Sequence, residues 1–305
     1  MSRFLARVEG LLARRRSAAG HRLLYGLAAL AFVAATALGV RALPPVEDPQ
    51  WGLLVIALVL AAPLTALVNG AEYVVTARIL GYRIAVSEAI RVAVLASAAN
   101  LLPVPGSIVV RAQALRRRGA TTGRAVWATA VTGLAWIAVA LAMAGALQAT
   151  VEPSWIAAGV TALGVVCLAG VAVAVRAIAG GGRAGLTLAL VAVEVGAVVV
   201  GAGRFLLVMH GVGIDAGARQ ALALSVSGVL AALIGIFPGG LGIRELLAGL
   251  IAPVVGLTAS VGVVVSAVDR VVALPALAVM ALAAAAARPT APDDGDDEGT
   301  DGVAQ

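Results

Sequence analysis

The sequence predicts an all-α polytopic membrane protein, and three observations carry this prediction. The mean hydropathy is +1.03, and only 12% of the residues are charged, about half the share that is usual in soluble domains. Several apolar runs reach the roughly 20 residues that a helix needs to cross a bilayer. The motif Pro-Gly-x4-Arg also occurs twice, at 105–111 and at 238–244. Paired Pro/Gly interruptions in two membrane halves are typical of transporters with discontinuous helices.

The chain begins with a basic arm, residues 1–22, in which arginines alternate with apolar residues at near-helical spacing. This pattern is typical of a short helix lying on the inner leaflet. About six spanning helices are expected after it, at 23–40, 51–77, 125–148, 155–175, 185–208 and 259–287. Residues 23–287 are therefore expected to form one transmembrane domain. The acidic segment 288–305 is expected to be a disordered tail.

Two further apolar segments, 92–110 and 220–257, contain the Pro/Gly interruptions. If 92–110 crossed the membrane, the loop arginines would be divided almost evenly between the two sides. If it enters and returns, only Arg41 and Arg219 are left on the outer side, as the positive-inside rule favours. We therefore expect two re-entrant hairpins and an inverted repeat, about 51–148 and about 185–287, in the cell membrane with both termini cytoplasmic. The residues expected at the two turns are Pro103, Pro105, Gly106, Pro238, Gly239 and Gly240. The alternative is that these residues only kink ordinary helices.

Charged residues inside the predicted spans are candidates for function, because a charge near the bilayer centre costs about 2.5–3.5 kcal/mol on insertion scales. Glu194, Asp269 and Arg270 lie near the middle of their segments. We expect Arg270 to pair with Glu194 or Glu245, or to bind an anionic substrate group; the alternative is an ion pair with a purely structural role. Arg204 is expected to reach the outer interface by snorkelling.

Arg111 follows the first interruption, and Arg244 and Glu245 follow the second. The planar guanidinium group suits bidentate phosphate binding, and the N-termini of the half-helices would aim backbone N–H groups at an anion. For Arg111 the alternative is a simple anchor at the cytoplasmic surface. Asn69 and Glu72 are expected either to line a cavity or to form a helix contact. The substrate-binding candidates are Arg111, Arg244, Glu245, Arg270, Asp269 and Glu194.

Several classes of function are disfavoured by what the sequence lacks. Every basic side chain is arginine, so neither a Walker A loop nor a lysine Schiff base is available. His21 and His210 lie in different segments, and Cys167 is the only cysteine, so no metal site is expected. No cluster of a nucleophile with acid and base groups is recognisable, so neither an enzyme nor a cofactor is expected. Nucleic-acid binding is not expected either, since no basic stripe is interleaved with aromatic residues.

The interrupted segments resemble a known family. The run 100–106 (NLLPVPG) with Arg111 beyond it, the run 237–245 (FPGGLGIRE) and Arg270 are similar to the transmembrane flippase domain of the lysylphosphatidylglycerol synthase family. The resemblance covers about residues 20–287. It implies translocation of lipid headgroups between leaflets, with roles for Arg111, Arg244, Glu245 and Arg270. No synthase domain follows in this sequence, so aminoacyl-lipid synthesis is not expected and the cargo is left open.

The function expected from these observations is that of a lipid flippase-like transporter. Its partners would be membrane lipids, either an anionic phospholipid or a polyprenyl-linked lipid, with a homo-oligomer left open. Without a nucleotide-binding loop, the drive would come from a gradient, the membrane potential or consumption of the product. Glu194, Glu245 or Asp269 would balance charge or carry protons. The alternatives are a membrane enzyme or an accessory subunit of envelope-lipid biosynthesis.

Overall fold

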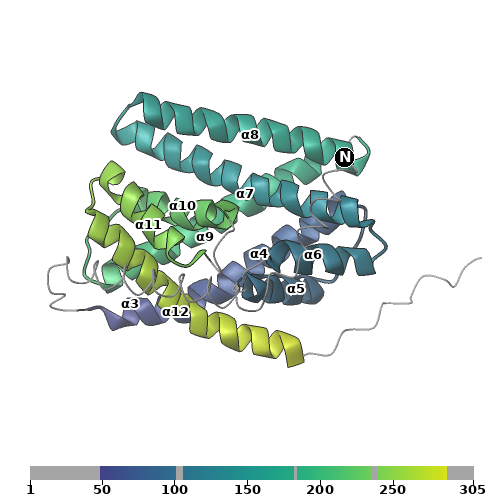
Figure 1. Ribbon diagram of the computed structural model, residues 1–305, viewed down its shortest axis with the longest axis horizontal. Coiled ribbons are helices and arrows are strands. Elements are labelled where there is room, and N and C mark those ends of the chain that lie inside the picture. Colours follow the sequence, from purple (N-terminus) through teal and green to yellow (C-terminus); the bar gives the residue numbers. More distant parts are fainter. Residues whose placement is uncertain (1–48, 101–105, 182–183, 235–239, 287–305) are drawn as a thin grey trace, which may run out of the picture.

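The computed structural model describes residues 49–100, 106–181, 184–234 and 240–286, and every regular element in these ranges is a helix (Figure 1). The all-helical prediction is therefore confirmed for this part of the chain. The expected basic arm (1–22), first span (23–40) and acidic tail (288–305) lie outside the described residues. Four of the predicted turn residues also lie outside them, namely Pro103, Pro105, Pro238 and Gly239.

Five of the described helices are long and apolar enough to cross a membrane. The first, Trp51–Ile79, consists of α3 (Trp51–Ile56), a π-helical turn η1 (Ala57–Ala61) and α4 (Ala62–Ile79). The other four are α7 (Thr122–Val151), α8 (Trp155–Ala179), α9 (Ala184–Gly211) and α12 (Ala259–Ala286). Each overlaps one of the predicted spans, so length and composition support a multi-pass membrane protein.

The two segments with Pro/Gly interruptions are pairs of short helices. The first pair is α5 (Val86–Ala99) and α6 (Gly106–Arg117); the second is α10 (Ala218–Ile234) and α11 (Ile243–Ile251), with a 3-10 turn η3 (Ala252–Val255) after it. With 14 and 12 residues, α5 and α6 extend about 21 and 18 Å at about 1.5 Å per residue. Neither reaches the roughly 30 Å thickness of a hydrocarbon core.

Each short pair begins and ends at the same end of the bundle. Arg118, just after α6, forms an ion pair with Glu88 in the first turn of α5. At the start of α10, Arg219 donates hydrogen bonds to the carbonyl of Val255 (3.2 Å) and to Oε1 of Gln148 near the end of α7 (3.0 Å). Arg118 lies just before the start of α7, and Gln148 lies near its other end. The two pairs therefore approach the bundle from opposite ends, as Figure 1 shows.

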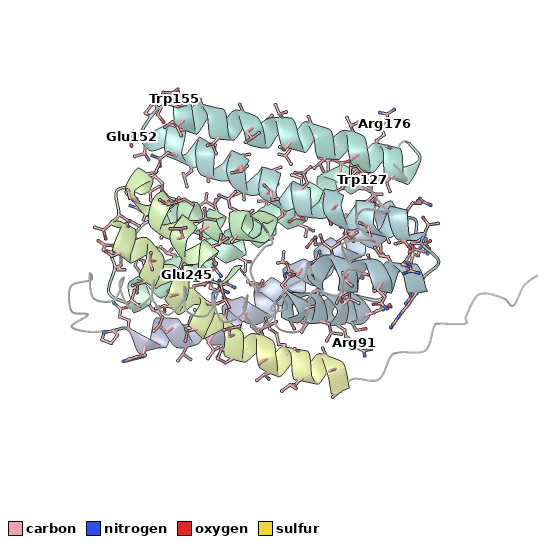
Figure 2. The ribbon with its side chains drawn as sticks, in the orientation of Figure 1. Arg91, Trp127, Glu152, Trp155, Arg176 and Glu245 are labelled. Carbon is pink, nitrogen blue, oxygen red and sulfur yellow. The ribbon has the colours of Figure 1, made fainter. Side chains whose placement is uncertain are left out.

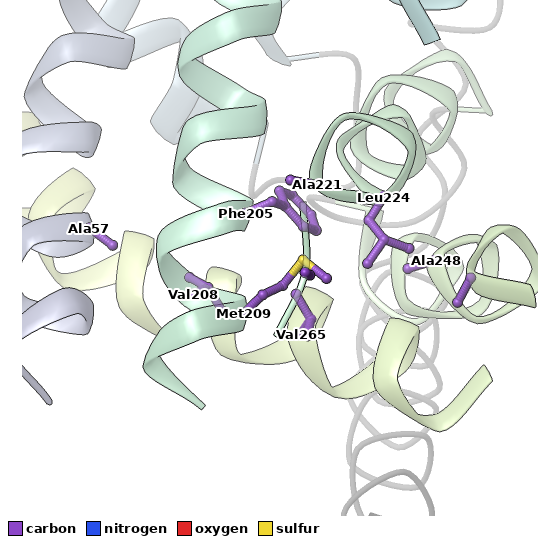
Figure 3. Packing of buried hydrophobic residues seen from close by; sticks show 10 residues of the cluster. Ala57, Phe205, Val208, Met209, Ala221, Leu224, Ala248 and Val265 are labelled. Atoms are coloured by element: carbon purple, nitrogen blue, oxygen red, sulfur yellow. The ribbon is translucent and has the colours of Figure 1, made fainter. Parts of the chain in front are cut away.

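Small residues let the second pair pack closely on the long helices. Figure 3 shows Phe205 and Met209 of α9 packed with Leu224 of α10 and Val265 of α12 in one apolar cluster. Beside it, a Cβ atom at Gly262 of α12 would lie 2.2 Å from the carbonyl oxygen of Ala248 in α11. Only glycine permits this approach, so α11 is held directly against the helix that carries Asp269 and Arg270.

The packing of α11 on α12 predicts that Gly262→Ala destabilises the protein. The added methyl group would meet backbone, which cannot rotate away, and such overpacking costs about 1–3 kcal/mol. The matched control is Gly196→Ala in α9, where a Cβ atom meets nothing within 4 Å. Thermal unfolding in detergent should show a lower midpoint for Gly262→Ala and no loss for Gly196→Ala. Equal midpoints for the two variants would contradict the described contact.

Candidate functional site: an arginine-lined pocket

A cavity of about 210 Å³ lies between α4, α5, α9, α11 and α12. It has room for several waters, at about 30 Å³ each, or for a small polar group. Three arginine side chains line it, Arg204, Arg244 and Arg270. The uncharged polar residues in the lining are Thr65, Asn69, Ser97 and Asn100, and most of the rest are small or apolar. The pocket therefore combines a strongly basic region with an apolar wall.

The helical repeat explains why the wall is continuous. On α12 the lining residues Arg270, Ala273, Leu274 and Leu277 recur every three or four positions and therefore share one face. This face is basic at Arg270 and apolar beyond it. Asn100 ends α5, where its Oδ1 accepts a hydrogen bond from the backbone N–H of Ser107 in α6 (2.9 Å). The tip of the first short pair is thus part of the pocket.

The carboxylate of Asp269 lies between two of the pocket arginines. It accepts hydrogen bonds from Nε and Nη2 of Arg204, at 2.5 and 3.0 Å, and from Nη2 of Arg244. Asp269 is fully buried, so water does not share in satisfying it. The snorkelling predicted for Arg204 is wrong, because packing of α9 on α12 gives this guanidinium a carboxylate partner inside the bundle. The guanidinium of Arg244 also lies over the ring of Phe205, 5.2 Å from its centroid.

Glu245 fixes the third pocket arginine. Its Oε1 accepts a hydrogen bond from Nε of Arg270 at 3.0 Å, which confirms Glu245 as a partner of Arg270. Its Oε2 accepts from the backbone N–H of Gly242 at 2.8 Å, so the same carboxylate caps the start of α11. Arg270 also donates to the carbonyl of Gly240 at 3.3 Å. Figure 2 shows Glu245 in the interior of the bundle.

The turn glycines within the described residues permit close approach or a rare backbone conformation. A Cβ atom at Gly106 would lie 2.1 Å from the carbonyl oxygen of Ala99, where α6 starts beside the end of α5. Gly240 has φ +69°, in the left-handed region that other residues avoid. Glycine is therefore required at position 106 by a close backbone approach and is favoured at position 240 by the backbone conformation.

A second buried cluster joins α4, α6 and α9. Nη1 of Arg111 donates a hydrogen bond to Oε1 of Glu72. The hydroxyl of Tyr73 donates to the backbone carbonyl of Arg111 at 3.3 Å, which attaches α6 to α4. Glu194, 1% exposed, interacts electrostatically with Glu72 and Arg111, and its Oε1 has no hydrogen-bond partner in the described part of the chain.

The structure thus divides the six candidate residues between two places. Arg244 and Arg270 line the pocket and Asp269 and Glu245 hold them, whereas Arg111 and Glu194 belong to the second cluster. Sequence reasoning missed the pocket role of Arg204 and assigned no partner to Glu72. The same signal, a charge within an apolar helix, was available for both residues.

The chain matches no model of a known protein family and no curated protein. The resemblance to the flippase family therefore rests on the motif residues alone.

Because one carboxylate holds two arginines, Asp269→Asn should destabilise the protein strongly. Removing one member of a buried ion pair costs about 3–5 kcal/mol, since the remaining charges stay desolvated without a partner. Asp215→Asn, at an exposed position between α9 and α10, is the matched control. The expected result is a clear fall in the thermal unfolding midpoint for Asp269→Asn alone. A midpoint equal to that of the control would show that Asp269 does not hold the arginines.

Proposed function

We propose that this protein is a lipid flippase-like transporter, which moves a lipid with an anionic headgroup between leaflets and binds that headgroup in the arginine-lined pocket. One observation carries the proposal. Three arginines, Arg204, Arg244 and Arg270, line the pocket, and among the described residues the carboxylates of Asp269 and Glu245 form ion pairs with them. The cluster therefore has an excess of one positive charge, and a phosphate group matches both this charge and the guanidinium geometry.

In this proposal the two short helix pairs are re-entrant hairpins that enter the membrane from opposite sides. Both pairs contribute a residue to the pocket, since Asn100 closes α5 and Arg244 belongs to the first turn of α11. Irregular backbone at membrane depth is tolerated where it lines a cavity. The order long helix, hairpin, long helix then occurs twice, in α4–α7 and in α9–α12, as in inverted-repeat transporters.

The charges at the two ends of the bundle support an orientation. Seven arginines lie at or near the end where α4 stops and α7 begins: Arg78, Arg83, Arg116, Arg117, Arg118, Arg124 and Arg176. Glu152 lies at the opposite end of α7, and Figure 2 shows it far from Arg176 along the α7–α8 pair. The positive-inside rule makes the arginine-rich end cytoplasmic. Nε of Arg91 binds the carbonyl of Ala284 at 2.8 Å, which brings the end of α12 to the same side.

The wall of the pocket suits a lipid better than a free anion. Leu274 is 36% exposed and lies between the arginine region and the outer surface of α12. Leu277 and Met280 extend the apolar lining along the same helix. The headgroup would occupy the basic region while the acyl chains stay in the bilayer beside α12. Since the chain contains no lysine for a Walker A loop, a gradient or the membrane potential would supply the drive.

Replacing a pocket arginine should abolish most of the transport. In proteoliposomes, Arg244→Gln and Arg270→Gln should slow translocation of fluorescent phosphatidylglycerol or polyprenyl phosphate at least tenfold. A hydrogen bond to a charged group contributes about 1.5–3 kcal/mol, and about 1.4 kcal/mol corresponds to a factor of ten. Testing both lipids in parallel identifies the cargo.

Arg83→Gln is the control for this experiment, because Arg83 is exposed and outside the pocket. Size-exclusion profiles and unfolding midpoints would show that the variants are folded. Undiminished translocation in both folded pocket variants would exclude the pocket as the headgroup site.

Labelling from one side of the membrane tests the proposed orientation. In a Cys167→Ser background, Arg117→Cys after the first hairpin should react with an impermeant maleimide only from the cytoplasmic side. Glu152→Cys, at the other end of α7, should react only from the outside; both positions are exposed. Labelling of Arg117→Cys from the outside alone would make the first hairpin a simple crossing and remove the repeat symmetry.

A further inference from the structure

The second cluster has the opposite charge imbalance to the pocket. Arg111 is one cation beside two carboxylates, Glu72 and Glu194, and its hydrogen bond goes to Glu72. Glu72, Glu245 and Asp269 each accept a hydrogen bond from an arginine, whereas Oε1 of Glu194 is buried without any partner among the described residues. A buried carboxylate without compensation is unfavourable, and binding a proton removes the charge. Glu194 is therefore the carboxyl group best placed to take up a proton.

Among the described residues, Glu72 is the other carboxylate of this cluster, and its hydrogen bond from Arg111 leaves Glu194 as the better proton acceptor. The charged residues acting on Glu194 are Glu72 from α4 and Arg111 from α6. The helices α7 and α10, which also pack against α9, are charged only near their ends within the described residues, and α8 has Arg176 in its last turn. Asp269 and Arg270 of α12 and Arg204 of α9 belong to the pocket cluster.

We infer that Glu194 is a proton-binding site, and that one proton is taken up there when a monovalent anionic headgroup enters the arginine-lined pocket. The coupling rests on the proposed function, whereas the proton site itself rests only on the burial and contacts of Glu194.

The stoichiometry follows from the charges of the two clusters. The pocket has three arginines and two carboxylates, 3 − 2 = +1, and the second cluster has one arginine and two carboxylates, 1 − 2 = −1. With an empty pocket and an ionised Glu194, the described residues of the two clusters together carry no net charge. A bound monoanion adds one negative charge, and a proton on Glu194 restores neutrality. By reciprocity, the anion favours protonation of Glu194, and lower pH strengthens anion binding.

Two structural connections link the sites. On α4, Asn69 lines the pocket, and Glu72 lies one turn further along, about 4.5 Å in rise. The α5–α6 pair carries Asn100 at the pocket and Arg111 at the second cluster. A headgroup that displaces Asn100 therefore acts on the same hairpin that holds Arg111 against Glu72. This hairpin is the element through which occupancy of the pocket reaches Glu194.

The proton site is tested first without any ligand. Difference infrared spectroscopy of the purified full-length protein in nanodiscs, over a pH titration, should show the carbonyl stretch of a protonated, buried carboxylic acid. This band should be missing in Glu194→Gln and unchanged in Glu152→Gln, where the carboxylate is exposed. Glu194→Asp should restore a band, which separates loss of the carboxyl group from misfolding. No band attributable to Glu194, or a band abolished by sodium ions at constant pH, would overturn the proton site.

The coupling is tested by calorimetry with short-chain phosphatidylglycerol in buffers of different ionisation enthalpy. The wild-type protein should take up about one proton for each anion bound, and Glu194→Gln should bind the anion with no proton uptake. Binding without proton uptake in the wild type, or uptake that persists in Glu194→Gln, would overturn the coupling. Absence of anion binding in the wild type would instead reject the proposed function together with the coupling, and the infrared band would still decide whether Glu194 binds a proton.

Discussion

The pocket depends on a single buried carboxylate. Asp269 on α12 accepts hydrogen bonds from Arg204 on α9 and from Arg244 on α11, so one side chain connects two long helices with the tip of the second short pair. Without it, the two guanidinium groups would repel each other with no carboxylate between them. The neighbouring Arg270 is held by Glu245, which also caps α11. The start of α11 is therefore fixed by electrostatics and by the close contact at Gly262.

Buried charges in this protein fix the positions of helices, and they also leave an excess of charge in each of the two clusters. Each ion pair satisfies groups that lipid could not, and thereby fixes helix positions. In each of the two clusters, however, the described arginines and carboxylates are unequal in number. The pocket cluster retains a positive excess, and the cluster of Glu72, Arg111 and Glu194 retains a negative one. The ion pairs fix helix positions, and the unequal numbers of arginines and carboxylates are the observation on which the proposed anion site and the proposed proton site rest.

Composition was sufficient to predict the long helices but insufficient to predict their neighbours. The expected spans 155–175 and 185–208 match Trp155–Ala179 and Ala184–Gly211 within a few residues, because hydropathy and helix length are local properties. For Arg270 the sequence allowed a pair with Glu194, a pair with Glu245 or binding of an anionic substrate group, and the structure pairs it with Glu245. Arg204 was misjudged because its depth along α9 is readable from the sequence, whereas the face that it presents to α12 is not. Asn100 was missed as a pocket residue for the same reason, since its place beside α4 and α12 is a property of helix packing.

The exclusive use of arginine in this chain fits the proposed site, in which a side chain would contact both a carboxylate and a phosphate. A guanidinium group has five N–H donors in a fixed plane, whereas an ammonium group is a compact point charge. Arg244 engages Asp269 through Nη2 only, and its Nε is buried without a partner in the described structure. A lysine at this position would carry its three donors on one nitrogen, so its contacts with Asp269 and with the phosphate of the proposed headgroup would share a single point charge. An arginine has donors on three nitrogens, so in the proposed site Arg244 can keep its contact with Asp269 through Nη2 while other donors of the same group bind a phosphate.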